Sequence, residues 1–177
     1  MTKSEAILGE IVREFPGFRI RKKAGSRLQR AIDVGLRIVT LCGQRVYLTR
    51  YHTLLGRTLW VPDAWQKKSD EFRYRLLRHE RVHLRQSRRL GVVLFGLLYF
   101  LPLPMFLSYG RARLEWEAYE ESIRAMAETR GIEAARRMKD GVVARFTGPA
   151  YGWMWPFPRT VGRWFDRVVR ELEKKVP

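Results

Sequence analysis

Two histidines and a glutamate in residues 78–84 have the spacing of a hydrolytic metal site. The stretch reads Arg-His-Glu-Arg-Val-His-Leu, with His79 and His83 four residues apart and Glu80 directly after the first. Residues four apart return to nearly the same side of an α-helix, about 6 Å along it, so both imidazoles can reach one metal ion. Glu80 lies about 100° around the helix, where it can meet a water at the metal's open position without being a ligand. The pattern therefore predicts a zinc site with Glu80 as general base.

A solvated helix rich in arginine and glutamate, with incidental histidines, is the alternative interpretation of this stretch. The chain holds three histidines, and two of them fall in the pattern with the acid correctly placed. A chance match of this kind is rare enough that we prefer the metal site.

The pattern resembles the active-site helix of the zincin metallopeptidases, and among them the gluzincins, whose third ligand is a downstream glutamate. The stretch Glu115-Trp-Glu117-Ala118 fits the first four places of the Glu-x-x-Ala-Asp pattern found in several integral-membrane gluzincins. The resemblance implies that Glu115 is the third zinc ligand and that the reaction is hydrolysis of a peptide bond in an unidentified peptide or protein. Glu117 projects about 200° away on the same helix, so at most one of the two faces the histidines, and Glu117 is the alternative.

The sequence departs from the family pattern at two positions. Tyr119 stands where the pattern has aspartate, and a phenol cannot act as a carboxylate partner to a ligand imidazole. Arg81 lies between the histidines, where the peptidase pattern prefers uncharged residues. The metzincin pattern is excluded, because Gln86 and Arg89 replace its glycine and its third histidine.

Two long helices are expected to carry these residues. Ser69, followed by two acids, is a start signal for the helix with the histidines, and the helix with Glu115 is expected over residues 111–130, ended by Gly131. One stripe of the first helix would face the core and the cleft. This stripe consists of Phe72, Leu76, His79, His83 and Gln86.

The 18 residues 90–107 contain no charged side chain. A run of about this length is the lower limit for a transmembrane helix. A full crossing would place His83 and Glu115 on opposite sides of a bilayer about 30 Å thick, where one ion could not bind both. Pro102 and Pro104 end a helix just before them and let the chain turn back. We therefore expect an apolar helical hairpin, either in the core of a soluble domain or dipping into one membrane leaflet.

The remaining patterns complete a fold of the α+β class, predominantly α, in a single zincin-like domain over residues 1–177. Further helices are expected over residues 1–15, from 26 onward and over 159–175, and strands over 18–21, 45–49 and 58–61. In the zincin architecture an edge strand lies over the metal cleft and pairs with extended substrate. The resemblance therefore assigns residues 58–61 to that strand, and an ordinary hairpin that stabilises the domain is an equally compatible interpretation.

Three further side chains are candidates for the site on weaker grounds. Tyr109 and Tyr119 could donate hydrogen bonds to an oxyanion. His52 is the remaining histidine, and a lone histidine near a loop is more often a polar surface residue than a ligand.

The charge of the chain predicts an acidic partner. The formal net charge is +17 at pH 7 and the pI is about 10.9, which fits nucleic acid, anionic lipid headgroups or an acidic polypeptide. Nucleic acid is less favoured, because the basic residues are scattered and no recognised binding motif is present. A non-catalytic basic protein of a membrane surface or of nucleic acid is the alternative to the metallopeptidase.

The single cysteine of the sequence predicts a reducing cellular compartment. Cys42 is the one cysteine in the sequence, which excludes an internal disulfide framework and fits a reducing environment. The first residues lack the basic start, apolar run and cleavage site of a secretory signal. Arginines flank both ends of the apolar run, so we expect a cytoplasmic protein, with peripheral or monotopic association at the inner face of the membrane as a further expectation.

Overall fold

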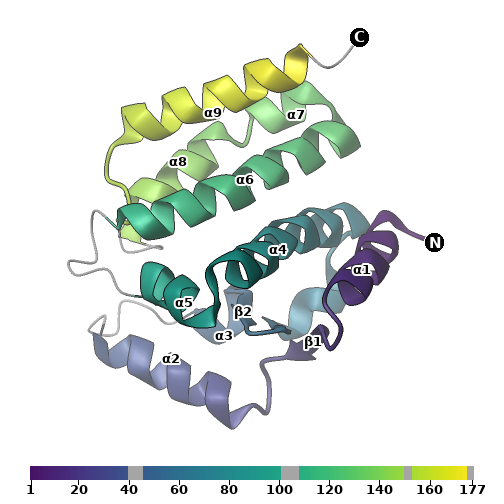
Figure 1. The fold of residues 1–177 in the computed structure, drawn as a ribbon, viewed down its shortest axis with the longest axis vertical. Coiled ribbons are helices and arrows are strands. Elements are labelled where there is room, and N and C mark those ends of the chain that lie inside the picture. Colours follow the sequence, from purple (N-terminus) through teal and green to yellow (C-terminus); the bar gives the residue numbers. More distant parts are fainter. Residues whose placement is uncertain (40–45, 101–107, 150–152, 175–177) are drawn as a thin grey trace. The chain divides into compact units, whose positions relative to one another are not determined.

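The computed structural model describes residues 1–39, 46–100, 108–149 and 153–174. In this part the chain is mostly helical with one small β-sheet, so the expected α+β, predominantly α fold is confirmed (Figure 1). The chain divides into two compact units, Met1–Arg73 and Tyr74–Pro177. The single domain over residues 1–177 stays a prediction.

The first unit opens with a capped helix. Its elements in order are α1 (Lys3–Glu14), β1 (Arg19–Lys22), α2 (Arg27–Val39), α3 (Tyr47–Arg50), β2 (Thr53–Leu55), β3 (Thr58–Val61) and the 3-10 helix η1 (Asp63–Lys67). The Thr2 hydroxyl accepts from the Glu5 backbone N–H, and the Glu5 carboxylate accepts from the Thr2 N–H. This capping box satisfies two donors at the start of α1, which confirms the first predicted helix.

The expected edge strand is wrong, because β3 is the central strand of its sheet. The strand order is β1-β3-β2, with β1 parallel and β2 antiparallel to β3. Leu59 of β3 lies opposite Ile20 on one side and Leu54 on the other. Both edges of β3 are therefore paired within the chain, and its backbone cannot take up an extended peptide as an additional strand.

The strand expected over residues 45–49 is also wrong. A single helical turn, α3, forms over Tyr47–Arg50, and residue 45 lies outside the described residues. The Tyr47 hydroxyl donates to Gln29 Oε1 at 2.7 Å, and the Tyr47 carbonyl accepts from Lys23 Nζ at 3.1 Å. These buried tertiary contacts fix the turn and override the strand preference of the local sequence.

His52 is partly buried within the first unit. Its ring packs edge-on against Trp65 at 5.6 Å and against Phe72 at 5.8 Å between centroids. Its Nε2 is buried without a hydrogen-bond partner. Burial, assisted by the charges of Lys23 and Lys68, lowers the pKa of His52 to about 4. The third histidine is therefore a neutral packing residue in this unit.

The free energy of unfolding should decrease as the pH falls, because acid protonates His52. The pKa of His52 is about 4 in the folded chain and about 6.5 when unfolded, so between these values the unfolded chain binds more protons and the free energy of unfolding decreases as pH falls. We expect His52→Phe to reduce the loss of stability between pH 7 and pH 5 by about 1 kcal/mol, after allowance for partial exposure. Urea unfolding of both proteins at the two pH values measures this difference. Equal losses in the two proteins would contradict it.

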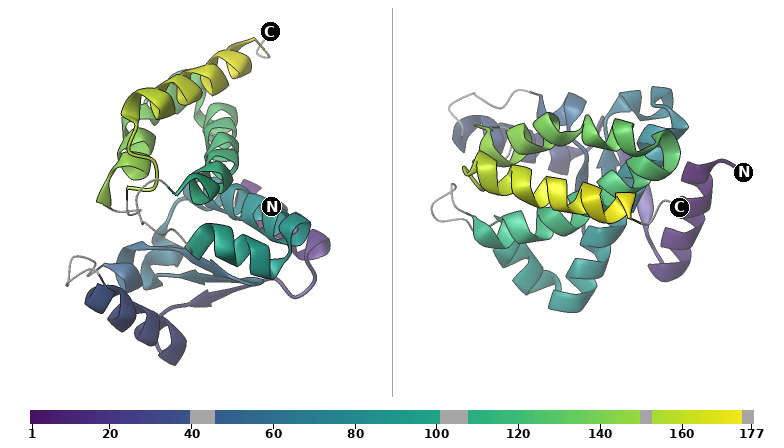
Figure 2. Two further views of the ribbon diagram at one scale, coloured as in Figure 1. Left: turned by 60° about the vertical axis from the view of Figure 1, so that its left-hand side comes forward. Right: turned by 90° about the horizontal axis from the view of Figure 1, so that it is seen from above.

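The second unit is built around one long helix, α6 (Tyr109–Arg130). Its elements are α4 (Asp70–Leu90), which begins in the first unit, α5 (Val92–Phe100), α6 (Tyr109–Arg130), α7 (Ile132–Arg136), α8 (Lys139–Thr147) and α9 (Pro158–Glu173). α6 packs against α7 and α9, and α9 packs in turn against α7 and α8 (Figure 2). The Trp116 ring stacks on Phe146 and Trp164 at the centre of this cluster. The expected helices over 111–130 and 159–175 are thus present, with bounds shifted by one or two residues at the ends.

The buried stripe of α4 differs in part from the expected one. His83 and Gln86 are buried as expected, whereas Leu76 and His79 are partly exposed. Leu77, Glu80 and Leu84 are buried in addition. The stripe therefore includes the candidate base as well as the second histidine.

The apolar run forms a short helix in the described residues. α4 ends at Leu90, Gly91 has a φ of +78°, and α5 follows over Val92–Phe100. The expected turn at Pro102 and Pro104 lies outside the described residues. A Cβ at Gly110 of α6 would lie 2.9 Å from Leu98, which shows how closely α5 and α6 approach. In the ranges that the structure describes, each helix is too short or too polar to span a membrane.

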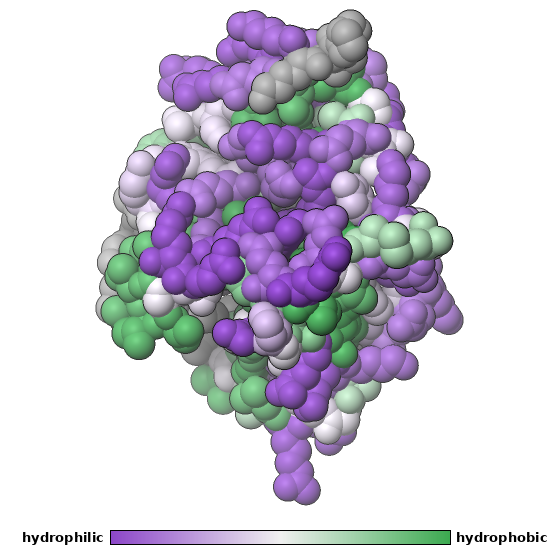
Figure 3. Space-filling view, turned by 45° about the vertical axis from the view of Figure 1, so that its right-hand side comes forward, coloured by the Kyte–Doolittle hydropathy of each residue, from purple (hydrophilic) through white to green (hydrophobic). Residues whose placement is uncertain are grey.

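Exposed apolar side chains are concentrated on two helices. Hydrophilic side chains cover much of the face seen in Figure 3, and hydrophobic ones gather between them in patches. Among the described residues, the large apolar side chains exposed on these two helices are Leu28, Val34 and Ile38 in α2 and Val92, Val93, Leu94 and Leu97 in α5.

Candidate metal centre

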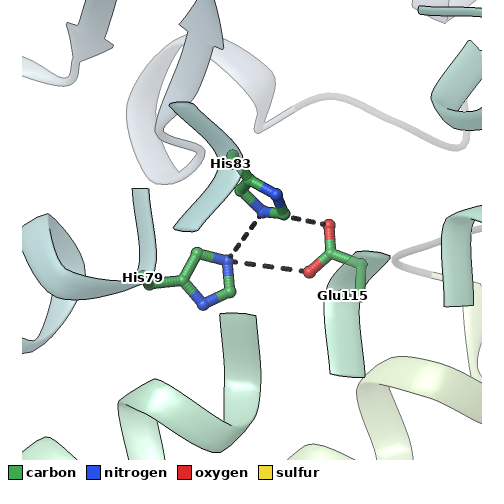
Figure 4. A group of neighbouring side chains, drawn as sticks. All are labelled: His79, His83 and Glu115. Carbon is green, nitrogen blue, oxygen red and sulfur yellow. Dashed lines mark hydrogen bonds and ion pairs between the residues drawn. The ribbon is translucent and has the colours of Figure 1, made fainter. Parts of the chain in front are cut away.

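The structure brings the two histidines and Glu115 together. His79 and His83 lie on successive turns of α4, with their Nε2 atoms 3.2 Å apart. Glu115 reaches them from α6, with Oε2 3.6 Å from His79 Nε2 and Oε1 3.7 Å from His83 Nε2 (Figure 4). One ligand atom from each of the three lies within 4.8 Å of the other two. These distances leave room for a small ion after minor adjustment of the side chains.

Glu117, the alternative third ligand, has other partners. Its Oε2 accepts from Gln86 Nε2 at 2.9 Å and lies 3.4 Å from Arg89 Nη2. Its side chain is 39% exposed, against 1% for Glu115. Of the two glutamates, the structure therefore places Glu115 with the histidines. Its role as a ligand stays a prediction.

A hydrogen-bond network fixes the tautomer of His83. Gln86 Nε2 donates to the Leu114 carbonyl and to Glu117, each at 2.9 Å, so Gln86 turns its Oε1 toward the imidazole. Gln86 Oε1 lies 2.8 Å from His83 Nδ1. An amide oxygen only accepts, so Nδ1 carries the proton and Nε2 of a neutral His83 presents a lone pair.

Ser122 gives His79 the same tautomer. The Ser122 hydroxyl donates to the Ala118 carbonyl at 3.2 Å, and the same oxygen lies 3.1 Å from His79 Nδ1. Because the hydroxyl proton is engaged with the carbonyl, Ser122 accepts from Nδ1–H. The lone pair of His79 then lies on Nε2, facing His83 and Glu115.

When both imidazoles are neutral in these tautomers, three electron-rich atoms converge. They are the Nε2 lone pairs of His79 and His83 and Glu115 Oε2, which is buried without a hydrogen-bond partner. Neutral imidazole nitrogens with the far ring nitrogen engaged, plus one carboxylate oxygen, form the donor set that divalent zinc takes in catalytic sites. The residues present fit such an ion.

Tyr99 was not predicted from the sequence and contacts the site directly. Its hydroxyl donates to Glu115 Oε1 at 2.5 Å, and its ring meets the His83 ring edge-on at 5.7 Å. Phe95, one turn earlier on α5, stacks on Tyr99 and also contacts His83. This phenol holds one oxygen of Glu115 and leaves the other directed at the imidazoles. The feature of the sequence that could have indicated Tyr99 is its polar hydroxyl, four residues after Phe95, within the uncharged residues 90–107.

The two tyrosines proposed as oxyanion donors differ in position. Tyr119 is buried, its ring lies edge-on to His79 at 5.0 Å, and its hydroxyl accepts from Arg145 at 2.9 Å. Tyr109 is 55% exposed, and its ring contacts Trp116 and Trp155. The structure therefore brings Tyr119, and not Tyr109, beside the histidines.

The electrostatics favour a neutral His79 imidazole and an ionised Glu115 carboxylate. Burial, and then the neighbouring His83, lower the pKa of His79 to about 3. Burial acts to raise the pKa of Glu115, but the histidines and the Tyr99 hydroxyl hold it below its ordinary value. Burial raises the pKa of Tyr99 well above 10, so the phenol keeps its proton.

Glu80 is buried one residue from the first histidine. It is 6% exposed, and burial raises its pKa to about 7, with the charge of Glu115 acting in the same direction and that of His83 against it. The Glu80 carboxyl group therefore lies close enough to His83 and Glu115 for their charges to shift its pKa.

Comparison with known proteins adds no assignment: no family model, curated protein or solved structure matches this chain.

Removal of the Tyr99 hydroxyl should weaken metal binding. In Tyr99→Phe the Glu115 carboxylate loses the donor that orients it, and outer partners of this kind are worth about 10–100-fold in metal affinity. Titration of the metal-free protein with Co²⁺, followed by its visible absorption, measures the affinity. Tyr109→Phe, which removes an exposed hydroxyl, should bind like wild type. Equal affinity in Tyr99→Phe and Tyr109→Phe would contradict the role given to Tyr99.

Proposed function

We propose that this chain is a zinc-dependent metallopeptidase that hydrolyses peptide bonds. His79, His83 and Glu115 would hold the ion, and Glu80 would be the general base. The observation that carries this proposal is the convergence of two Nε2 lone pairs and an unpartnered carboxylate oxygen, all buried, with both tautomers fixed from outside. Two imidazoles and one carboxylate leave a fourth position open for water or substrate.

The proposed chemistry divides between the ion and the chain. A zinc ion bound by these residues would supply a Lewis acid that polarises a carbonyl and acidifies water. Glu80 would accept a proton from the attacking water and deliver it to the leaving amine. Gln86 and Ser122 keep the imidazoles in the tautomer that binds, and Tyr99 keeps Glu115 oriented. A set of two histidines and one glutamate accommodates several divalent ions, so zinc is proposed from the resemblance as well as from the ligands.

We also propose a cytoplasmic location. The sequence contains a single cysteine, which fits a reducing compartment where thiols stay free.

Metal content distinguishes the two glutamates. We expect purified wild type to bind one equivalent of zinc, and His83→Ala and Glu115→Ala to lose affinity by more than about 100-fold, the upper limit for partners outside the ligand set. Glu117→Ala is the matched control, because it removes the same group two residues away on the same helix and should keep its zinc. Elemental analysis after dialysis measures all four proteins. Retention of zinc in Glu115→Ala with loss in Glu117→Ala would overturn the ligand assignment, and a zinc-free wild type would overturn the proposed function.

Glu80→Gln separates catalysis from metal binding. The amide cannot take a proton from water, so the rate of hydrolysis should fall by about 10²–10⁴-fold. The zinc content should stay equal to wild type, because Glu80 is not a proposed ligand. Cleavage of unfolded casein, followed by release of soluble peptides, is a suitable assay. Glu120→Gln on α6 is the control acid, and equal rates in Glu80→Gln and wild type would remove Glu80 from the mechanism.

A further inference from the structure

Helix α2 buries two polar side chains and leaves three large apolar ones exposed. Gln29 and Asp33 are 0% and 4% exposed, whereas Leu28, Val34 and Ile38 are 54%, 55% and 71% exposed. Amphipathic helices of globular proteins normally turn the apolar stripe toward the core. In α2, Ile32 and Leu36 are partly buried with the polar residues, whereas the other three large apolar side chains stay exposed together with the arginines.

Buried polar contacts hold α2 in this orientation. The Tyr47 hydroxyl donates to Gln29 Oε1 at 2.7 Å, and Arg37 pairs with Asp33 at 2.8 Å. Lys23, itself 1% exposed, donates to Tyr47 and Thr53 and lies near enough to Asp33 for their charges to interact. The Arg37–Asp33 pair lies within the helix, but a rotation that buried the three exposed apolar side chains would break the Tyr47–Gln29 hydrogen bond and separate Asp33 from Lys23.

Helix α9 of the second unit shows that amphipathic character alone does not require an external partner. α9 also combines an apolar side with exposed arginines, but Val161, Phe165 and Val168 are buried in its own core. What is unusual in α2 is that three large apolar side chains stay exposed while two polar side chains are buried.

The charge around α2 indicates what lies against it. Between Glu14 and Asp63 the sequence holds ten lysines and arginines and one acidic residue, Asp33. Arg27 and Arg30 of α2 itself are exposed. Exposed apolar side chains interspersed with cations match the surface of an anionic bilayer, where phosphates lie just outside the acyl chains.

We propose that α2 is an interfacial helix that docks on an anionic lipid bilayer. Leu28, Val34 and Ile38 insert between the headgroups, and Arg27 and Arg30 meet the lipid phosphates. The helix lies parallel to the bilayer and does not cross it, because its polar side is occupied by contacts with its own unit. This inference is independent of the metal centre and would stand if the proposed hydrolase failed.

Flotation of the full chain with vesicles tests the proposal. We expect wild type to float with phosphatidylcholine vesicles that contain phosphatidylglycerol, and to bind phosphatidylcholine alone much more weakly. The triple variant Leu28→Gln, Val34→Gln, Ile38→Gln should lose at least about tenfold in affinity, because each side chain would lose its apolar burial in the bilayer. The triple variant Leu28→Met, Val34→Leu, Ile38→Leu keeps the apolar character at the same positions and should bind like wild type.

The cationic border has its own matched pair of variants. Arg27→Gln with Arg30→Gln should weaken binding by about 25-fold, about fivefold for each arginine near an anionic surface. Arg163→Gln with Arg167→Gln removes the same charge from exposed positions on α9 and should change binding much less. Circular dichroism should be unchanged throughout, because every substituted side chain is exposed.

Four outcomes would overturn the proposal. These are absence of wild-type flotation, equal binding to neutral and anionic vesicles, unchanged binding of the glutamine triple variant, and equal losses in the α2 and α9 arginine pairs. Sedimentation without lipid tests a second copy of the chain as the occupant. A dimer that the glutamine triple variant abolishes would assign the α2 surface to self-association and overturn the lipid assignment.

Discussion

The candidate site depends on one electrostatic constraint: two imidazole lone pairs and a carboxylate point at the same buried spot. His79 and His83 could relieve the repulsion by moving a proton to Nε2, but each would then lose the partner of its Nδ1–H, Ser122 or Gln86. Protonation of both nitrogens of His79 is opposed by burial, which lowers its pKa to about 3. The proposed metal ion would satisfy all three atoms without breaking the bonds that hold them.

The groups behind the ligands are neutral, and this has a chemical consequence. Gln86 and Ser122 accept from the imidazoles where a carboxylate often does so in zinc sites. A neutral acceptor donates less electron density through the ring than a carboxylate, so an ion bound here would be a stronger Lewis acid. Arg145, bonded to Tyr119 beside His79, adds positive potential in the same direction. Around His79 the acceptor is Ser122, and Tyr119 lies beside the ring without accepting from it.

Helical periodicity predicted that His79 and His83 lie side by side, because this depends on local spacing. The resemblance singled out Glu115, which lies beside them in the structure, and its role as a ligand stays a prediction. Tyr99 and Ser122 were missed, because their roles arise only when α5 and α6 pack beside α4. The turn at Tyr47 was predicted as a strand for the same reason, since its conformation is set by buried contacts with Gln29 and Lys23. Strand order likewise depends on pairing between distant segments, so the central place of β3 was beyond the local sequence.

The direction that an amphipathic helix faces is a further property that sequence periodicity does not specify. Both α2 and α9 combine apolar and basic residues, yet α9 buries most of its large apolar side chains, whereas α2 leaves Leu28, Val34 and Ile38 exposed. The difference lies in the polar side: α2 carries Gln29 and Asp33, for which the surrounding chain supplies Tyr47 and Lys23 as buried partners. Burial of a polar face is costly unless it is satisfied, so a chain that supplies those partners stabilises the outward orientation of the apolar face. The exposed apolar side chains of α2 would be stabilised most by burial in a lipid bilayer. The positive charge of this part of the sequence favours a bilayer with an anionic surface.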